Sequence, residues 1–235
     1  MFPQRAHHGC MTGSASGMAV RLIGGPTVLI EVGGLRLLTD PTLDRTMDEI
    51  GPVDAVLLSH DQHGEPLGPG GRSLLERAPL ILTNPGCAAQ LGGCARGLPP
   101  WYHLSLARSD GGVLRITGVP TQQGPDETVQ RTGFVLSGMD IPTGYISVTN
   151  ISLDVVREIA RRFGPIDFAV LNGSFARSGK QAFQVAAILD FPTIILAPVE
   201  GWEHLRVLAP GETAMFYAQC RWSASQREEA GEHLP

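Results

Sequence analysis

The chain is most informative at residues 22–44, which read LIGGPTVLIEVGGLRLLTDPTLD. Two apolar runs, TVLIEV and LRLLT, flank the pair Gly33-Gly34, which favours the tight turn of a β-hairpin. Asp40-Pro41 ends the second run, because proline is disfavoured inside a central strand. We therefore predict a hairpin over residues 27–39, preceded by a strand over residues 19–23.

The rest of the chain alternates apolar strands with amphipathic helices. GPVDAVLLSH, residues 51–60, predicts a buried strand that enters a loop. We expect further strands over residues 79–84, 112–120, 132–138, 143–148, 166–171 and 191–198. We expect helices over residues 71–78, 85–93, 153–163, 179–190 and 201–208. The strands come first and the helices are interleaved later, which favours one α/β domain of two packed sheets with outer helices.

Composition excludes several classes of protein. The chain has 235 residues and a net charge of -5 without a Lys/Arg cluster, which argues against nucleic-acid binding. No apolar run is long enough to cross a membrane, and the N-terminus lacks the apolar core of a secretory signal. The four cysteines form no CxxC pair. We expect a bacterial, cytoplasmic protein with a polar tail over residues 1–18, a single domain over 19–220 and a second polar tail over 221–235.

One loop concentrates the chemically active side chains. SHDQHGEPLG, residues 59–68, follows the strand at VDAVLL and contains His60, Asp61, His63 and Glu65. Histidine titrates near neutral pH, and a neighbouring carboxylate can orient the ring and raise its pKa. These four residues are our candidates for acid–base catalysis. The alternative is a surface loop whose histidines hydrogen-bond neighbouring backbone.

Several segments together resemble one family. They are residues 22–44, GPVDAVLLSHDQH (51–63), LTNPGCAAQLGG (82–93), GLPPW (97–101), SLDVVREIARRFGPIDFAVL (152–171) and EGWEHL (200–205). In this order they resemble the metallo-β-lactamase superfamily, in its bacterial MBL-fold metallo-hydrolase branch. The resemblance implies a four-layer αββα sandwich whose active site lies in loops at strand ends. It also implies one or two metal ions, most often zinc, that activate water for hydrolysis.

The ligand positions that the resemblance implies are largely replaced. The H-x-H-x-D-H loop can be read in two registers: from His60 it gives Gln62, Gly64 and Glu65 at the later positions, and from Asp61 it gives His63, Glu65 and Pro66. Gln123 replaces a histidine, Thr149 replaces the bridging aspartate, and Pro198 takes the place of the last histidine. Proline offers no side-chain ligand, and a glutamine carbonyl is a weak zinc ligand. We therefore expect no metal cofactor, and the alternative is an atypical mononuclear zinc site.

Other residues become candidates for binding a substrate in the vacated cleft. Neutral hydrogen bonds from Gln123, Thr149 and Asn150 could hold a substrate or a developing oxyanion. Asn172 is a further candidate because it follows a predicted strand at the same edge, and Glu200 and Trp202 are candidates because they resemble the EGW segment of the family. Simple filling of volume, a turn at Asn172, and packing of Trp202 are the structural alternatives.

Three functions remain open on these grounds. The leading expectation is a metal-independent enzyme that performs cyclisation, dehydration, isomerisation or hydrolysis on a small organic substrate in bacterial specialised metabolism. The alternatives are a zinc-dependent lactonase-like or esterase-like hydrolase, and a non-catalytic pseudoenzyme that binds a ligand or a partner. Neither nucleic acid nor membrane is an expected partner, and a homodimer is compatible with the sequence.

Overall fold

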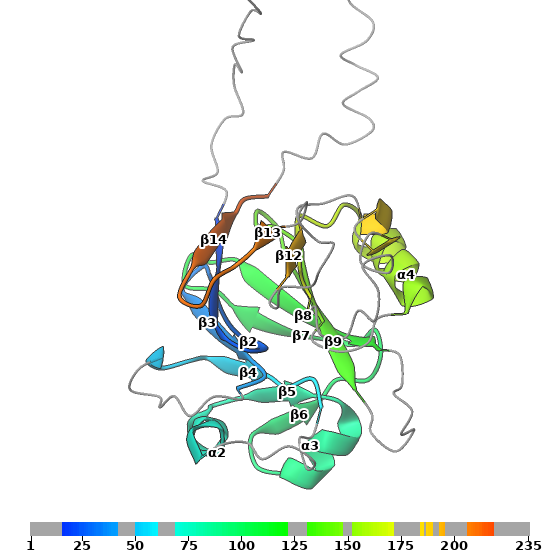
Figure 1. Cartoon of the computed structure of the whole chain (residues 1–235). Coiled ribbons are helices and arrows are strands. Elements are labelled where there is room, and N and C mark those ends of the chain that lie inside the picture. The colour runs from blue at the N-terminus through cyan, green and yellow to red at the C-terminus, as the bar shows by residue number, and fades with distance from the viewer. Residues whose placement is uncertain are drawn as a thin grey trace, which may run out of the picture.

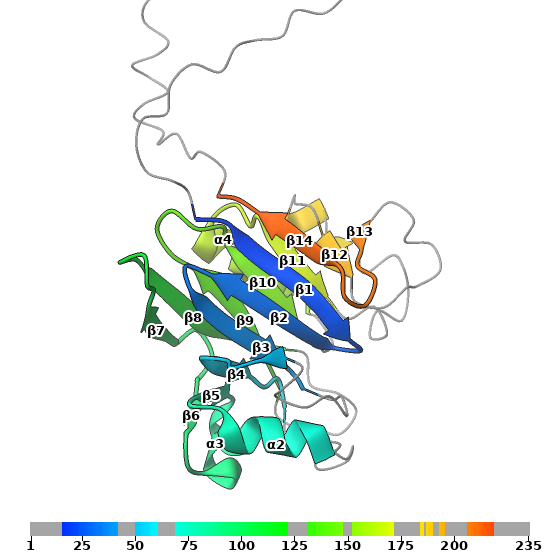
Figure 2. The ribbon, with the colours of Figure 1, turned by 90° about the vertical axis from the view of Figure 1, so that its left-hand side faces the viewer.

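The computed structural model describes residues 16–41, 50–60, 69–121, 131–147, 152–171, 184–185, 187–189, 193–195 and 206–218. Within these residues, two seven-stranded sheets lie face to face, with helices on their outer faces (Figure 1). Figure 2 shows the strands of the first sheet crossing in front of those of the second. This arrangement confirms the predicted four-layer αββα sandwich.

The first sheet has the strand order β14-β1-β2-β3-β4-β5-β6. Its strands are β1 (Met18–Gly24), β2 (Thr27–Val32), β3 (Leu35–Thr39), β4 (Ala55–Leu57), β5 (Ile81–Thr83), β6 (Ala95–Gly97) and β14 (Thr213–Phe216). The predicted hairpin is confirmed, because β2 and β3 pair antiparallel from Val28↔Thr39 to Val32↔Leu35. Gly33 and Gly34 form its turn with φ values of 52° and 82°, which glycine adopts readily.

The second sheet has the order β13-β12-β11-β10-β9-β8-β7. Its strands are β7 (His103–Ala107), β8 (Val113–Pro120), β9 (Thr132–Ser137), β10 (Gly144–Ser147), β11 (Phe168–Leu171), β12 (Thr193–Ile195) and β13 (Arg206–Val207). Strands β7 to β10 pair antiparallel, whereas β10 to β13 pair parallel. The parallel strands of each sheet thus bring their carboxyl ends to one edge.

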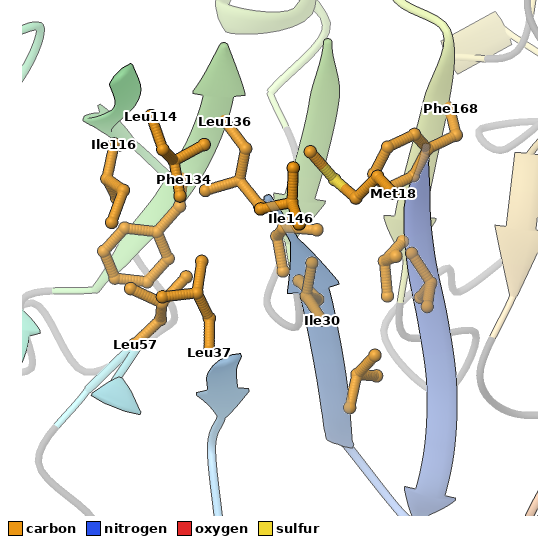
Figure 3. Close-up of a cluster of buried hydrophobic side chains, with 14 of the residues drawn as sticks. Met18, Ile30, Leu37, Leu57, Leu114, Ile116, Phe134, Leu136, Ile146 and Phe168 are labelled. Atoms are coloured by element: carbon orange, nitrogen blue, oxygen red, sulfur yellow. The ribbon is translucent and has the colours of Figure 1, made fainter. Parts of the chain in front are cut away.

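Alternation along each strand divides the apolar residues among separate cores. In β4, for example, Ala55 and Leu57 face the core between the sheets, whereas Val56 faces the outer side. The core between the sheets is drawn in Figure 3, where Ile30 and Leu37 of the first sheet approach Phe134 and Ile146 of the second. This dry interface holds the two sheets together.

Helices cover the outer face of each sheet. Helices α2 (Pro69–Arg77) and α3 (Pro85–Leu91) lie on the first sheet, where Leu74 and Cys87 pack against Leu38 and Val56. Helix α4 (Leu153–Phe163) lies on the second sheet and buries Val156 and Ile159. No described helix is long and apolar enough to cross a membrane.

Helix ends follow the sequence signals. Asn84 caps α3, since its side chain accepts a hydrogen bond of 2.8 Å from the Cys87 backbone N–H, and Pro85 opens the first turn. Ser152 precedes α4 in an extended conformation, and Gly164 ends that helix with φ of 68°. Arg162 of α4 lies over the Trp101 ring, with its guanidinium carbon 4.4 Å from the ring centroid.

Some sequence predictions were wrong or incomplete. The helix predicted over residues 201–208 is contradicted at its end, because Arg206 and Val207 form β13 and pair with β12. Strands β6, β7 and β14 were not predicted. Of the helix predicted over residues 179–190, the described residues 184–185 and 187–189 are helical. The two predicted tails lie almost wholly outside the described residues.

We predict that Phe134→Ala lowers the free energy of unfolding by about 3–5 kcal/mol, because it leaves a cavity in the core between the sheets. Phe134 is 2% exposed there. Met139→Ala is the matched control, since Met139 is 83% exposed and should change stability by less than about 0.5 kcal/mol. Urea unfolding of both variants measures the difference, and equal losses would contradict the proposed core.

Candidate functional site

The candidate site lies where the two sheets meet at one edge. The carboxyl ends of β3 and β4, the end of β8 and the start of β9 all lie there. We call this edge the rim and define it by Asp40, Ser59, His60, Thr121 and Arg131. The Thr132 backbone N–H donates a 2.8 Å hydrogen bond to the Ser59 carbonyl, which joins the first sheet to the second at this point.

Most of the predicted site residues belong to segments that leave the rim. The described residues that flank these segments are the ends of β4, β8, β10, β11 and β12. Strand pairing places the last four ends at one edge of the second sheet, and the hydrogen bond from Thr132 to Ser59 brings the end of β4 to the same edge. The following candidates lie outside the described residues: Asp61, His63, Glu65, Gln123, Thr149, Asn150, Asn172, Glu200 and Trp202. His60 is the candidate whose position the structure describes.

Asp40 is a buried carboxylate directly after β3. Its Oδ1 accepts hydrogen bonds of 2.8 Å from both the backbone N–H and the hydroxyl of Ser59. Its carbonyl accepts a 2.8 Å hydrogen bond from the Thr27 hydroxyl. Its φ of 34° is positive, a backbone conformation that aspartate tolerates better than most residues. The neighbouring strands thus fix the position of this carboxylate.

Burial controls the protonation of Asp40. Desolvation raises the pKa of this carboxyl to about 6 from an ordinary value of 3.8, whereas the Ser59 hydrogen bonds and the Arg131 charge act in the opposite direction. The group is therefore ionised at pH 7 but gains a proton in mildly acidic solution.

Ser59 links Asp40 to His60. The Ser59 hydroxyl oxygen lies 2.8 Å from Nδ1 of His60. A serine hydroxyl has one proton, and Ser59 donates it to ionised Asp40. His60 must therefore donate from Nδ1–H to the Ser59 oxygen. This assignment leaves Nε2 of His60 with its lone pair available.

His60 is neutral at pH 7. Burial, followed by the positive charge of Arg131, lowers the pKa of its imidazole to about 4 from 6.5. The expectation that His60 titrates near neutrality is therefore wrong. Among the residues that the structure describes, the Asp40 carboxylate is linked to the ring through Ser59, and Arg131 is the charged group that acts on the ring. His60 can accept a proton or a hydrogen bond at Nε2, but it carries no extra proton to donate at pH 7.

Sequence reasoning missed Asp40, Ser59 and Arg131. Asp40 and Ser59 each follow a buried parallel strand, so a polar residue directly after such a run was the available signal. For Arg131 the signal was weaker, because its place at the rim depends on the pairing of β9 with β8. His103, which the sequence suggested to be a packing or surface residue, is exposed on β7.

The described residues contain no group of three or more His, Cys, Asp or Glu side chains placed to hold a metal ion. The remaining members of the predicted loop lie outside this part of the chain. What the described geometry provides is one neutral imidazole, held by Ser59 and Asp40, beside one arginine.

Solved structures with a similar fold include a metallo hydrolase and an isothiocyanate hydrolase. No family model matches the chain, and no curated protein matches it in sequence. Igni18, a metallo hydrolase from the archaeon Ignicoccus hospitalis, is similar with a TM-score of 0.68 at 16% identity, covering 86% of this chain and 100% of that chain. An isothiocyanate hydrolase from Delia radicum gut bacteria gives 0.67 at 19% identity, with coverage of 86% and 100%.

A third similar structure performs different chemistry. CmlA, a diiron β-hydroxylase from Streptomyces venezuelae, has a TM-score of 0.57 at 15% identity, covering 78% of this chain and 45% of that chain. At these identities the likeness concerns the fold and not the reaction. Together with the two facing sheets and their outer helices, it shows that the protein has the αββα fold, which is the metallo-β-lactamase fold.

Proposed function

We propose that the protein is a metal-independent enzyme on this hydrolase fold that acts on a small organic substrate by acid–base catalysis. The observation that carries the proposal is the chain of hydrogen bonds from Asp40 through Ser59 to His60. It fixes one tautomer of the imidazole and presents Nε2 as a base. We place the enzyme in the cytoplasm of a bacterium, in specialised metabolism.

His60 would take the role of general base. Its Nε2 accepts a proton from the substrate or from a water in the transition state, and its low pKa makes it return that proton readily. The acid role would fall to a different group, and His63 is our candidate, with Asp61 and Glu65 as neighbours. Gln123, Thr149, Asn150, Asn172, Glu200 and Trp202 would bind the substrate.

The available donors do not fit a dinuclear metal centre. Gln123, Thr149 and Pro198 occupy the places where the superfamily has a histidine, an aspartate and a histidine. In addition, the charge of Arg131 contributes, after burial, to the lowered pKa of His60, and the same charge would repel a metal cation. Both observations favour metal-independent chemistry.

A mononuclear zinc hydrolase is the second candidate. Metal-bound histidines commonly donate the ring N–H that faces away from the metal to a hydrogen-bond acceptor, which fixes the tautomer. His60 fits this arrangement in that its Nδ1 is bound to Ser59, which places the lone pair of the imidazole on Nε2. The two candidates differ in metal content, which can be measured directly.

We predict substoichiometric zinc, below about 0.1 ion per chain, in protein purified without a histidine tag from zinc-supplemented cells. Zinc should also leave the melting temperature unchanged, because a ligand that does not bind the native state cannot stabilise it. Elemental analysis and thermal unfolding provide the two measurements. One zinc per chain, together with activity that a chelator abolishes and zinc restores, would establish the second candidate instead.

We predict that His60→Gln lowers chelator-resistant turnover by about 100-fold or more, the usual contribution of a general base. The measurement is turnover of a panel of lactones and aryl esters by the full chain in excess chelator. His103→Gln is the control, because His103 is exposed on β7. Equal rates for the wild type and His60→Gln would remove His60 from catalysis, and no turnover by the wild type would favour a pseudoenzyme.

The pKa values of Asp40 and His60 give opposite pH dependences of stability. The pKa of Asp40 is raised to about 6 in the native protein from 3.8 in the unfolded chain, so the native protein binds this proton more tightly. The contribution of Asp40 to the free energy of unfolding therefore falls as pH rises from about 4 to 6. Native His60, with its pKa lowered to about 4 from 6.5, binds its proton less tightly, so its contribution rises between about pH 4 and 6.5. In the wild type the two slopes largely cancel.

Single substitutions should separate these slopes. His60→Gln leaves the slope of Asp40, and we expect its unfolding free energy to fall by about 2 kcal/mol from pH 4 to 6. Asp40→Asn leaves the slope of His60, and we expect a rise of about 2 kcal/mol, which is reduced by the partial exposure of His60. Urea unfolding across pH 4–7 measures both, and two profiles parallel to the wild type would disprove the assigned protonation states.

A further inference from the structure

Arg131 brings a fixed positive charge to the rim. It directly precedes β9, next to Thr132, whose backbone N–H bonds the Ser59 carbonyl at 2.8 Å. The guanidinium Nε atom is shielded from solvent. Arg131 therefore approaches, from the second sheet, the same point at which Asp40, Ser59 and His60 meet in the first.

The charge of Arg131 acts on two groups at the rim, the Asp40 carboxyl and the His60 imidazole. Burial is the main cause of the raised pKa of Asp40 and of the lowered pKa of His60, and the Arg131 charge acts on both groups in the lowering direction, although they belong to different strand ends. A positive charge lowers the pKa of a carboxyl and of an imidazole alike. The guanidinium is thus near enough to the rim for its field to act on a bound substrate.

Thr121 adds a buried hydroxyl beside Arg131. Pro120 pairs with Thr132 at the last rung between β8 and β9, so Thr121 and Arg131 occupy the next position outward. The Thr121 Oγ1 atom is shielded from solvent and has no hydrogen-bond partner in the described part of the chain. Burying a hydroxyl without a hydrogen-bond partner costs about 1–3 kcal/mol of stability. A ligand atom that accepts this hydrogen bond would remove that cost.

We propose that Arg131 and Thr121 form a subsite for an oxyanion group of the substrate, a carboxylate or a phosphate, next to Nε2 of His60. A guanidinium binds either group through charge-assisted hydrogen bonds, and the threonine hydroxyl donates one more. This inference deepens the proposed function because it names the chemical class of the substrate. The substrate would carry an anionic group that anchors it while His60 acts on a neighbouring atom.

The subsite can be tested without knowledge of the substrate. We expect the full-length protein to bind inorganic phosphate or acetate in calorimetric titrations at low salt. Arg131→Gln should weaken this binding by about 10-fold or more, and Arg131→Lys by less, because lysine keeps the charge but loses the fork of donors. Thr121→Val should weaken it by about 5-fold, since it removes one hydrogen bond.

Arg115→Gln is the matched control, because Arg115 is an exposed arginine on β8, and it should bind the anions as the wild type does. Preference for phosphate or for acetate identifies the substrate group, and either result supports the subsite. No binding by the wild type, or equal affinities for the wild type and Arg131→Gln, would overturn it. His60→Gln should retain anion binding. A failure of the catalytic proposal would therefore appear in turnover alone, and a failure of the subsite proposal would appear in anion binding. Thermal unfolding of each variant confirms that it is folded.

Discussion

The hydrogen bonds of a single residue, Ser59, connect the parts of the rim. Its N–H and its hydroxyl bind the Asp40 carboxylate, its hydroxyl oxygen accepts from His60, and its carbonyl accepts from the backbone of Thr132. These bonds join the ends of β3 and β4 to the start of β9, and therefore join the two sheets. Any chemistry at His60 depends on a position that both sheets define together.

The protonation order at this junction is unusual. Burial makes the carboxyl of Asp40 hold its proton more tightly than the imidazole of His60, with pKa values of about 6 and about 4. In a solvent-exposed pair the imidazole would be protonated first. Desolvation disfavours both charged forms, and the Arg131 charge disfavours an imidazolium further. The result is an uncharged imidazole beside a permanent cation.

The fold could be predicted from sequence because it depends on local patterns. The apolar alternation in TVLIEV and LRLLT, with Gly33-Gly34 between them, specified the hairpin, and the spacing of Val156 and Ile159 specified α4. Strands β6, β7 and β14 escaped prediction because they are short or largely exposed edge segments. Arg206 and Val207 were assigned to a helix because their strand character comes from pairing with β12, which the local sequence does not encode.

The site was less predictable for a related reason. His60 stood out as a histidine after a buried strand, but its partners Asp40 and Arg131 are distant in the sequence. Which strand ends meet is decided by sheet order, and the pKa of His60 is decided by burial. Without knowledge of these contacts, the sequence identifies His60 as a candidate catalytic residue but does not reveal its protonation state.

Alternation in β4 also limits how the chain can change in length. Ala55 and Leu57 face the core between the sheets while Val56 faces the outer core, and Ser59 follows two residues later. One residue inserted or deleted between Asp54 and Ser59 would exchange these faces and move Ser59 away from Asp40. The chain between Asp54 and Ser59 therefore tolerates no change in length, and this keeps the junction of the sheets fixed.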